Sequence, residues 1–357
     1  MIWDYKKGDD IPFFDARQSY ELTHYIPINE TSGLNFDPKW FRQDAIKKEK
    51  TGKYCDAIRG TEEYNIFWKE RIKRFKEGYE SHGYRITGDN YFFINYYELD
   101  LLQEGTQTGT GRDRGLPEFL VFQYEYFHYL EMCEILNKDV CTIKSRSVGW
   151  SEIGASVMAN RFSTRPNYRC LVTAALDGHM DGIRSMVWKE LTYLNEETQE
   201  ALKHLCQVHN TNDFKRATYL DNEGKEKGWW SEIEFKVSED PNKLRSDRCD
   251  VIVLEESGSN KRLKEGKIKA DALTSIRGRK MGTIIMQGTG GDSGDTMANF
   301  KDIVSDPEKY NILPVRHNYT DSGEDIISAM FVPVWRNCKK EQLDKRGFVT
   351  MEIGMKD

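Results

Sequence analysis

The central part of the chain alternates short apolar runs with segments of helical composition, and this alternation constrains the fold more than any other feature. The apolar runs are "DVCTI" (139–143), "YRCLVTA" (168–174), "CDVIVLE" (249–255) and "GTIIMQG" (282–288). Runs of this length and composition are typical of strands buried on both faces. Helices are expected after the first two runs, at 151–162 and 181–194. Strands that alternate with helices predict an α/β fold, with a mainly parallel sheet flanked by helices.

The flanking regions carry further signals. The sequence predicts a helix over 61–79, a hairpin over 83–97 around Gly-Asp-Asn, a polar loop over 101–115, and an inserted β-hairpin over 210–237 around "NEGKEKG". We expect the loop to separate an N-terminal extension or lid (1–110) from a main domain (111–335). Residues 336–357 would be a tail or the start of a linker.

Composition limits the class of protein. The chain has 357 residues, 52 basic and 58 acidic, so its formal net charge is −6. A protein that only coats nucleic acid would normally be basic, so any contact with DNA should be local or transient. No apolar run approaches the roughly 20 residues needed to span a bilayer. The seven cysteines form no CxxC pair, which favours a reducing compartment. We expect a soluble intracellular globular protein.

The segment "KSRSVGWS" (144–151) follows the first apolar run and resembles a displaced phosphate-binding loop. The usual P-loop is Gly, four residues, Gly, Lys, then Ser or Thr. Here Lys144 takes the place of the first glycine, Gly149 keeps the second, Trp150 replaces the lysine and Ser151 keeps the hydroxyl. The flexible stem of Lys144 could still bring its ammonium group to the phosphates. The alternative is an ordinary strand-to-helix turn with solvated cations.

Two more strands end in reactive residue types. "DVIVLEE" places Glu255 and Glu256 after an apolar run, where one acid could hold Mg²⁺ and the other could activate water. "IIMQGTGGDSGD" ends in a loop with Thr289, Gly290 and Asp292 that could sense the γ-phosphate. Alternatively, the acids cap a helix or face solvent, and the loop is a flexible turn. Ligands bind beyond the carboxyl ends of parallel strands, so all three ends could serve one site.

Together these motifs resemble the large terminase subunit, the DNA-packaging ATPase of tailed double-stranded DNA bacteriophages. One branch of that family has a Walker A loop whose lysine is displaced to its beginning, as in "KSRSVGWS"; "VIVLEE" is similar to its Walker B element and "GTGGD" to its coupling motif. Gln123 lies where the family carries an adenine-contacting glutamine. The resemblance covers roughly residues 83–335. The nucleotide-binding residues it implies are Gln123, Lys144, Ser145, Ser147, Val148, Gly149, Trp150 and Ser151.

The resemblance implies a P-loop NTPase fold of the ASCE type that hydrolyses ATP to translocate double-stranded DNA into a procapsid. Glu256 would be the catalytic base and Arg146 a cis-acting arginine finger, with Arg245 and Arg248 as alternatives for contacts across a ring or with DNA. Ser151 and Glu255 would hold Mg²⁺. Thr289, Gly290 and Asp292 would couple hydrolysis to movement.

The family also implies partners and a place of action. These are the portal protein, the small terminase subunit and a homo-oligomeric ring, in the cytoplasm of the infected bacterial host at the portal vertex of the procapsid. The sequence departs from the family in two respects. Glu255 stands where Asp is usual, and no nuclease domain follows residue 335, so we expect no DNA cleavage by this chain.

Other functions stay open from the residues alone. The chain could be another ASCE ATPase such as a helicase, or a nucleotide-binding adaptor that has lost hydrolysis. His204, Cys206 and His209 suggest a zinc site but lack a second ligand pair. Trp229 and Trp230 could bind a partner, although one packing inward and one covering the hairpin is the simpler interpretation.

Overall fold

A mainly parallel sheet forms the centre of the protein. The computed structural model describes residues 6–7, 12–15, 36–102, 112–145, 149–244, 248–289, 295–317 and 326–332. The strand order is β18-β7-β15-β12-β8-β11-β10-β9. The first six strands pair in parallel, and the last three form antiparallel pairs. Their bounds are β18 (Met330–Val332), β7 (Val140–Lys144), β15 (Thr283–Thr289), β12 (Val251–Glu255), β8 (Arg169–Ala174), β11 (Glu226–Val237), β10 (Phe214–Leu220) and β9 (His209–Asn210). The predicted α/β fold is confirmed, and so are the four predicted strands.

The alternating direction of side chains along a strand explains why the central strands are apolar throughout. In β12, Val251 and Val253 belong to one hydrophobic cluster, whereas Ile252 and Leu254 belong to another. Each cluster lies on its own side of the sheet because successive side chains point to opposite faces. Helices must therefore cover both faces, and the strands show no alternation of polar and apolar residues.

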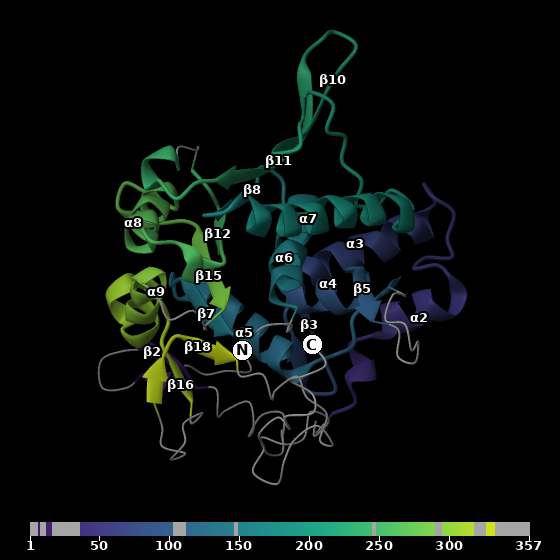
Figure 1. Ribbon diagram of the computed structural model, residues 1–357. Coiled ribbons are helices and arrows are strands. Elements are labelled where there is room, and N and C mark those ends of the chain that lie inside the picture. Colours follow the sequence, from purple (N-terminus) through teal and green to yellow (C-terminus); the bar gives the residue numbers. More distant parts are fainter. Residues whose placement is uncertain are drawn as a thin grey trace.

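Helices cover the two faces. On one side lie α5 (Val121–Ile135), α6 (Trp150–Thr164) and α7 (Asp177–Glu197), and on the other lie α8 (Leu263–Leu273) and α9 (Asp295–Ser305) (Figure 1). Residues of α8 and α9 join the cluster that contains Ile252 and Leu254. The helices expected at 151–162 and 181–194 are thus present as α6 and α7.

The N-terminal part is mostly helical. Its elements are η1 (Pro38–Trp40), α2 (Gln43–Thr51), α3 (Glu62–Glu77), β3 (Tyr79–Ser81), β4 (Tyr84–Ile86), α4 (Gly88–Tyr96), β5 (Leu99–Leu102) and β6 (Arg112–Gly115). The helix expected over 61–79 is α3. The hairpin expected over 83–97 is wrong, because only 84–86 is a strand and Gly-Asp-Asn begins α4. The Thr87 side chain caps this helix by accepting a hydrogen bond from the backbone N–H of Asn90.

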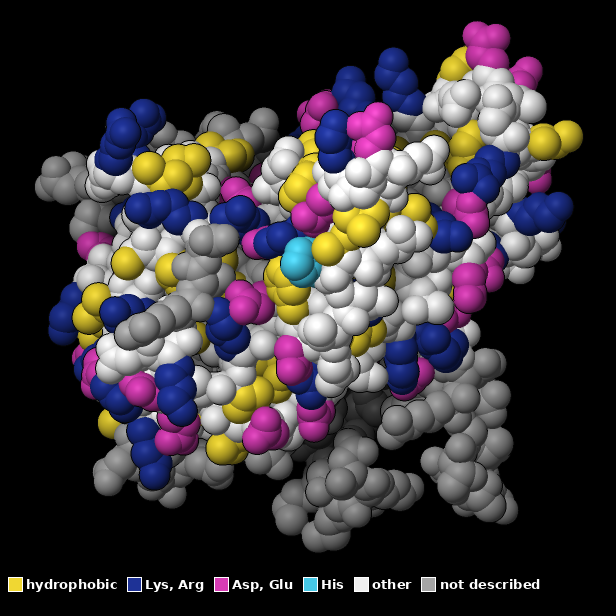
Figure 2. Space-filling model, turned by 90° about the horizontal axis from the view of Figure 1, so that it is seen from above, with side chains coloured by type: hydrophobic (Ala, Val, Ile, Leu, Met, Phe, Trp, Pro, Cys, Tyr) yellow, Lys and Arg dark blue, Asp and Glu magenta, His cyan; other side chains and the backbone are white. Residues whose placement is uncertain are grey.

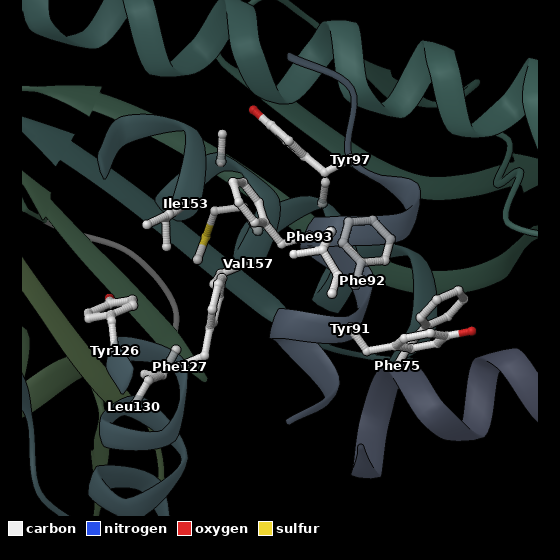
Figure 3. Close-up of a cluster of buried hydrophobic side chains, with 14 of the residues drawn as sticks. Phe75, Tyr91, Phe92, Phe93, Tyr97, Tyr126, Phe127, Leu130, Ile153 and Val157 are labelled. Carbon is white, nitrogen blue, oxygen red and sulfur yellow. The ribbon is translucent and has the colours of Figure 1, made fainter. Parts of the chain in front are cut away.

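Aromatic side chains join these N-terminal helices to the central sheet. Phe92 and Phe93 from α4, Tyr126 and Phe127 from α5, and Ile153 from α6 meet in one buried cluster (Figure 3). The aromatic side chains of α5 in this cluster are therefore part of the hydrophobic core. The proposed boundary near residue 110 lies between β5 and β6, which pair with each other. The division into extension and main domain stays a prediction, and the two parts share one hydrophobic cluster.

The inserted hairpin is present as β10 and β11, which project from the body of the protein (Figure 1). The C-terminal half of β11, from Glu232 to Val237, also pairs in parallel with β8. One strand thus serves both the hairpin and the central sheet. Trp229 stacks on His204 with ring centroids 4.7 Å apart, and Trp230 is 39% exposed. The two tryptophans therefore differ in burial.

Short elements complete the described structure. A second sheet has the order β1-β2-β16-β17, and β13 pairs with β14. The bounds are β1 (Lys6–Lys7), β2 (Pro12–Asp15), β16 (Val315–His317), β17 (Ile326–Ser328), β13 (Ser275–Ile276), β14 (Arg279–Lys280), η2 (Pro241–Lys243), η3 (Ser257–Ser259) and η4 (Glu308–Tyr310). Basic and acidic side chains are interspersed over the face in Figure 2. Within the described ranges, no helix has the length and apolar character to cross a membrane.

A buried arginine joins three helices of the core. Arg161 on α6 is fully buried, forms an ion pair with Asp89 of α4 at 2.7 Å, and pairs with Glu134 of α5. We expect Arg161→Met to lower the free energy of unfolding by about 3–5 kcal/mol, because two carboxylates would lose their shared buried partner. Urea denaturation measures this.

The control is Arg59→Met, which removes a guanidinium that is 63% exposed and pairs with Glu200. An exposed ion pair contributes about 0–1 kcal/mol. If both variants unfold at the same urea concentration, the network around Arg161 does not hold the helices together.

Candidate active site

Three neighbouring strands end together and bring Lys144, Glu256 and Thr289 into contact. Lys144 and Thr289 are register partners at the ends of β7 and β15. The ammonium of Lys144 lies 3.0 Å from Oε1 of Glu256 and 3.2 Å from Oγ1 of Thr289. Residues from three separate sequence motifs therefore form one polar group at the carboxyl edge of the sheet.

Glu256 is held in an unusual backbone conformation. Its φ of 42° and ψ of 52° lie in the left-handed region, which is strained for a residue with a side chain. The Ser259 hydroxyl donates to its carbonyl oxygen at 2.7 Å. On the side chain, the Thr289 backbone N–H donates to Oε2 at 3.0 Å. The strained turn directs this carboxylate toward Lys144 and Thr289.

Electrostatics keep Glu256 ionised. Burial would raise its pKa, but the charge of Lys144 and the hydrogen bonds from Thr289 and Lys144 outweigh burial, so the pKa lies below its ordinary value. The stability that these contacts provide is present above the pKa of the unfolded chain. It is lost as the pH falls through the lower pKa of the folded state.

Glu255 lies at the end of β12 and is buried, unlike its neighbour. The Ser151 hydroxyl donates to Oε1 of Glu255 at 2.5 Å, and the Gln287 amide Nε2 donates to Oε2. Burial raises the pKa of Glu255 above its ordinary value, although both hydrogen bonds oppose that change. The two consecutive acids thus have opposite pKa shifts and separate partners.

The N-terminus of α6, with Gly149 before it, suits the binding of an anion. Gly149 precedes the helix with a φ of 69°, and among the described residues a Cβ at this position would meet no atom within 4 Å. The first N–H groups of a 15-residue helix point toward that end. Ser145 donates its backbone N–H to Val332 of β18 at 3.2 Å. Arg146, Ser147 and Val148 lie outside the described residues.

Trp150 occupies the position of the usual P-loop lysine but points into the core. Its side chain is 1% exposed; it stacks on Phe122 of α5 with centroids 6.1 Å apart and meets Tyr126 edge to face with centroids 4.7 Å apart. Because the indole is buried, any contact between Trp150 and a nucleotide would come from its backbone. Among the described residues of this loop, the cation available to a nucleotide is Lys144.

The other expected site residues lie in different places. Gln123 on α5 is buried, and its Oε1 has no hydrogen-bond partner within the described part of the chain. Arg248 precedes β12, at the strand end opposite to the acids, and donates to the Ala272 carbonyl at 3.4 Å. It is therefore not part of this site. Gly290, Asp292 and Arg245 fall outside the described residues.

A magnesium ion fits the donor set in part. Mg²⁺ is usually bound by one or two carboxylates together with phosphate and water oxygens. Glu255 offers one carboxylate, and the Ser151 hydroxyl oxygen lies beside it. The ranges that the structure describes contain no group of three His, Cys, Asp or Glu side chains suited to a metal. His204, which instead contacts the Ser163 carbonyl at 2.7 Å, forms no zinc site with Cys206 and His209 there.

Sequence reasoning missed Gln287. It lies within the apolar run "TIIMQGT" of β15 and is 1% exposed. A polar side chain in a strand buried on both faces was the available signal, because buried polar groups require partners. The structure provides that partner for Nε2 in Glu255, whereas Oε1 has none among the described residues.

No protein-family model matches the sequence, and no curated protein matches it. Among solved structures, it is similar to the large terminase of bacteriophage HK97, at 12% identity and a TM-score of 0.41, covering 64% of this chain and 43% of that one. It is also similar to the large terminase ATPase domain of Thermus phage P74-26, at 14% identity and a TM-score of 0.35, covering 44% of this chain and 62% of that one. A third is the large terminase of a thermophilic bacteriophage in complex with ADP, at 10% identity and a TM-score of 0.34, covering 60% and 44%. In each case, less than two thirds of the other chain is matched.

Proposed function

We propose that this chain is an ATPase of the large-terminase type, which hydrolyses ATP to move double-stranded DNA into a procapsid. The observation that supports this proposal is the meeting of Lys144, Glu256 and Thr289 at three strand ends, with Ser151 and Glu255 beside them. A cation, a pair of acids and a helix N-terminus at one edge are the parts that phosphoryl transfer to water requires.

Each residue has a defined role in the proposal. Lys144 and the first N–H groups of α6 bind the phosphates, and Glu256 removes a proton from the attacking water. Ser151 and Glu255 would hold a magnesium ion, which would supply positive charge beside the phosphate oxygens. Gln123 would contact the adenine, which would provide a partner for its buried Oε1, unpaired among the described residues. Arg146 would stabilise the transferred phosphoryl group, as the family resemblance implies.

The contact between Lys144 and Glu256 has a consequence for activity. While the ammonium is paired with Glu256, that carboxylate is a weaker base, because its pKa is held down. Phosphate oxygens compete for the same ammonium. When Lys144 turns to the phosphates, Glu256 loses its cation and becomes a better proton acceptor. Thr289, which contacts both groups, would transmit the change to the coupling loop.

The partners in this proposal come from the family resemblance. They are double-stranded DNA, the portal protein, the small terminase subunit and other copies of this chain in a ring. The main domain would carry the ATPase and the N-terminal part would act as a lid. The work would take place at the portal vertex in the host cytoplasm.

The direct test is release of phosphate from ATP by the purified chain, with Mg²⁺, in the presence and absence of double-stranded DNA. We expect hydrolysis that requires Mg²⁺ and is stimulated by double-stranded DNA. Binding of ATP without turnover would favour the adaptor instead. Stimulation by single-stranded DNA together with strand separation would favour a helicase-like ATPase.

A further inference from the structure

Glu255, Gln287 and Thr142 occupy adjacent positions on three neighbouring strands. Leu254 of β12 pairs with Met286 of β15, so the next step along this register sets Glu255 beside Gln287. On its other side, Gln287 pairs with Thr142 of β7. Paired residues of neighbouring parallel strands point to the same face, so the three side chains form a row across the sheet. Gln287 also lies close to Gly154 of α6.

Gln287 supplies half of the support for the Glu255 carboxylate. Ser151 donates to one carboxylate oxygen and Nε2 of Gln287 donates to the other. Both Glu255 and Gln287 are buried, so water does not readily replace either hydrogen bond. With one oxygen fixed by an amide on a strand, the carboxylate cannot rotate without leaving a buried donor unpaired.

The close approach of α6 depends on a residue without a side chain. A Cβ at Gly154 would lie 3.1 Å from Nε2 and 3.6 Å from Oε1 of Gln287. The first distance is tighter than ordinary packing, so the glutamine amide fits beneath the helix because position 154 is glycine. The absence of a side chain at Gly154 therefore leaves room for the Gln287 amide beside Glu255.

The chemistry of an amide suits this position. Glu has one more rotatable bond than Asp, so a longer carboxylate loses more freedom when it is fixed and needs more support. An amide N–H donates without bringing a positive charge, so it does not repel a cation that binds at Glu255. The Ser151 hydroxyl can donate to Glu255 while its lone pairs stay available to a metal.

We propose that Gln287 is a positioning residue that orients Glu255 toward the divalent cation of the bound nucleotide, and that Gly154 makes room for it. The inference rests on the proposed function, because it assigns Glu255 to that cation. Partners that orient metal ligands in this way typically contribute about 10- to 100-fold to metal affinity.

The test is the binding of Mn²⁺ to the complex of the whole chain with a non-hydrolysable ATP analogue, followed by the electron paramagnetic resonance signal of free Mn²⁺. We expect Gln287→Leu to raise the dissociation constant of Mn²⁺ by about 10-fold or more. The affinity for the analogue in the absence of metal should not change. A loss of Mn²⁺ affinity alone indicates a positioning role. A general loss of structure would weaken the binding of both Mn²⁺ and the analogue.

The matched control is Thr142→Val, which removes a buried polar group from the same row without touching Glu255. Its hydroxyl has no hydrogen-bond partner among the described residues, so Mn²⁺ affinity should stay at the wild-type level. Should Gln287→Leu fail to fold, Gly154→Ala provides the second measurement. Alanine favours the helix but forces Gln287 to move, so Mn²⁺ affinity should fall while the helix stays intact.

A double variant decides whether Gln287 acts through Glu255. In a Glu255→Gln background, Gln287→Leu should cause no further loss of Mn²⁺ affinity. An equal loss in both backgrounds, or wild-type Mn²⁺ affinity in Gln287→Leu, would overturn the inference and leave the proposed function standing. If the wild-type chain binds neither the analogue nor Mn²⁺ with it, the proposed function fails and the inference falls with it.

Discussion

Glu256→Gln is expected to lower the turnover of ATP by about 100- to 10,000-fold, the usual contribution of a general base. Glutamine keeps the shape of the side chain and can still contact Thr289, but it cannot accept a proton from water. The affinity for ATP should be kept or improved, because Lys144 would no longer be paired with a carboxylate 3.0 Å away. Steady-state phosphate release gives the turnover, and titration with a fluorescent ATP analogue gives the affinity.

The matched control is Glu63→Gln, the same chemical change at an exposed acid in the first turn of α3. Its turnover should equal that of the wild-type chain. Wild-type turnover in Glu256→Gln would exclude Glu256 as the base. A large loss of affinity would mean that the carboxylate serves binding rather than proton transfer.

Lys144→Ala is expected to weaken ATP binding by about 10- to 100-fold. The estimate follows from about 1.5–3 kcal/mol for a hydrogen bond to a charged group and about 1.4 kcal/mol for each tenfold change in affinity. The variant also removes the cation that lowers the pKa of Glu256, so that pKa should rise. Isothermal titration measures the affinity, and a pH titration of the folded chain followed by carboxyl NMR signals measures the pKa.

Trp150→Phe is the matched control within the same loop. Trp150→Ala would leave a cavity beneath α6 at a cost of about 3–5 kcal/mol, so the larger truncation would confuse binding with stability. Phenylalanine keeps an aromatic ring against Tyr126, and its affinity for ATP should stay close to the wild-type value. If Trp150→Phe loses affinity and Lys144→Ala does not, the alignment of this loop with a displaced-lysine Walker A is wrong.

Local patterns in the sequence predicted much of the fold. The apolar run 249–255 predicted β12, because a strand with both faces buried has no polar side, and the same argument held for β7, β8 and β15. The error at 83–97 has a physical cause. Gly-Asp-Asn is a strong turn signal, but Thr87 provides a helix cap and the aromatic run after it is buried almost completely, so tertiary packing selected α4.

The sequence motifs of the candidate site were predictable, but the spatial arrangement of their residues was not. Lys144, Ser151, Glu255, Glu256 and Thr289 were singled out because each follows an apolar run. Nothing in the sequence showed that β15 lies between β7 and β12, or that Lys144 contacts Glu256. Gln287 was missed for the same reason, because its importance depends on a partner on the neighbouring strand.

The sequence by itself determined the four central strands, the helices at 61–79, 151–162 and 181–194, and which strand ends carry reactive side chains. These properties depend on the spacing of apolar residues over a few positions, and burial and backbone sterics act at that range. Only the tertiary structure decided that Trp150 faces the core, that Glu255 and Glu256 have different partners, and that Gln287 supports one of them. Those contacts depend on the packing of segments that are distant in the sequence, as in the 32-residue separation of Gln287 and Glu255.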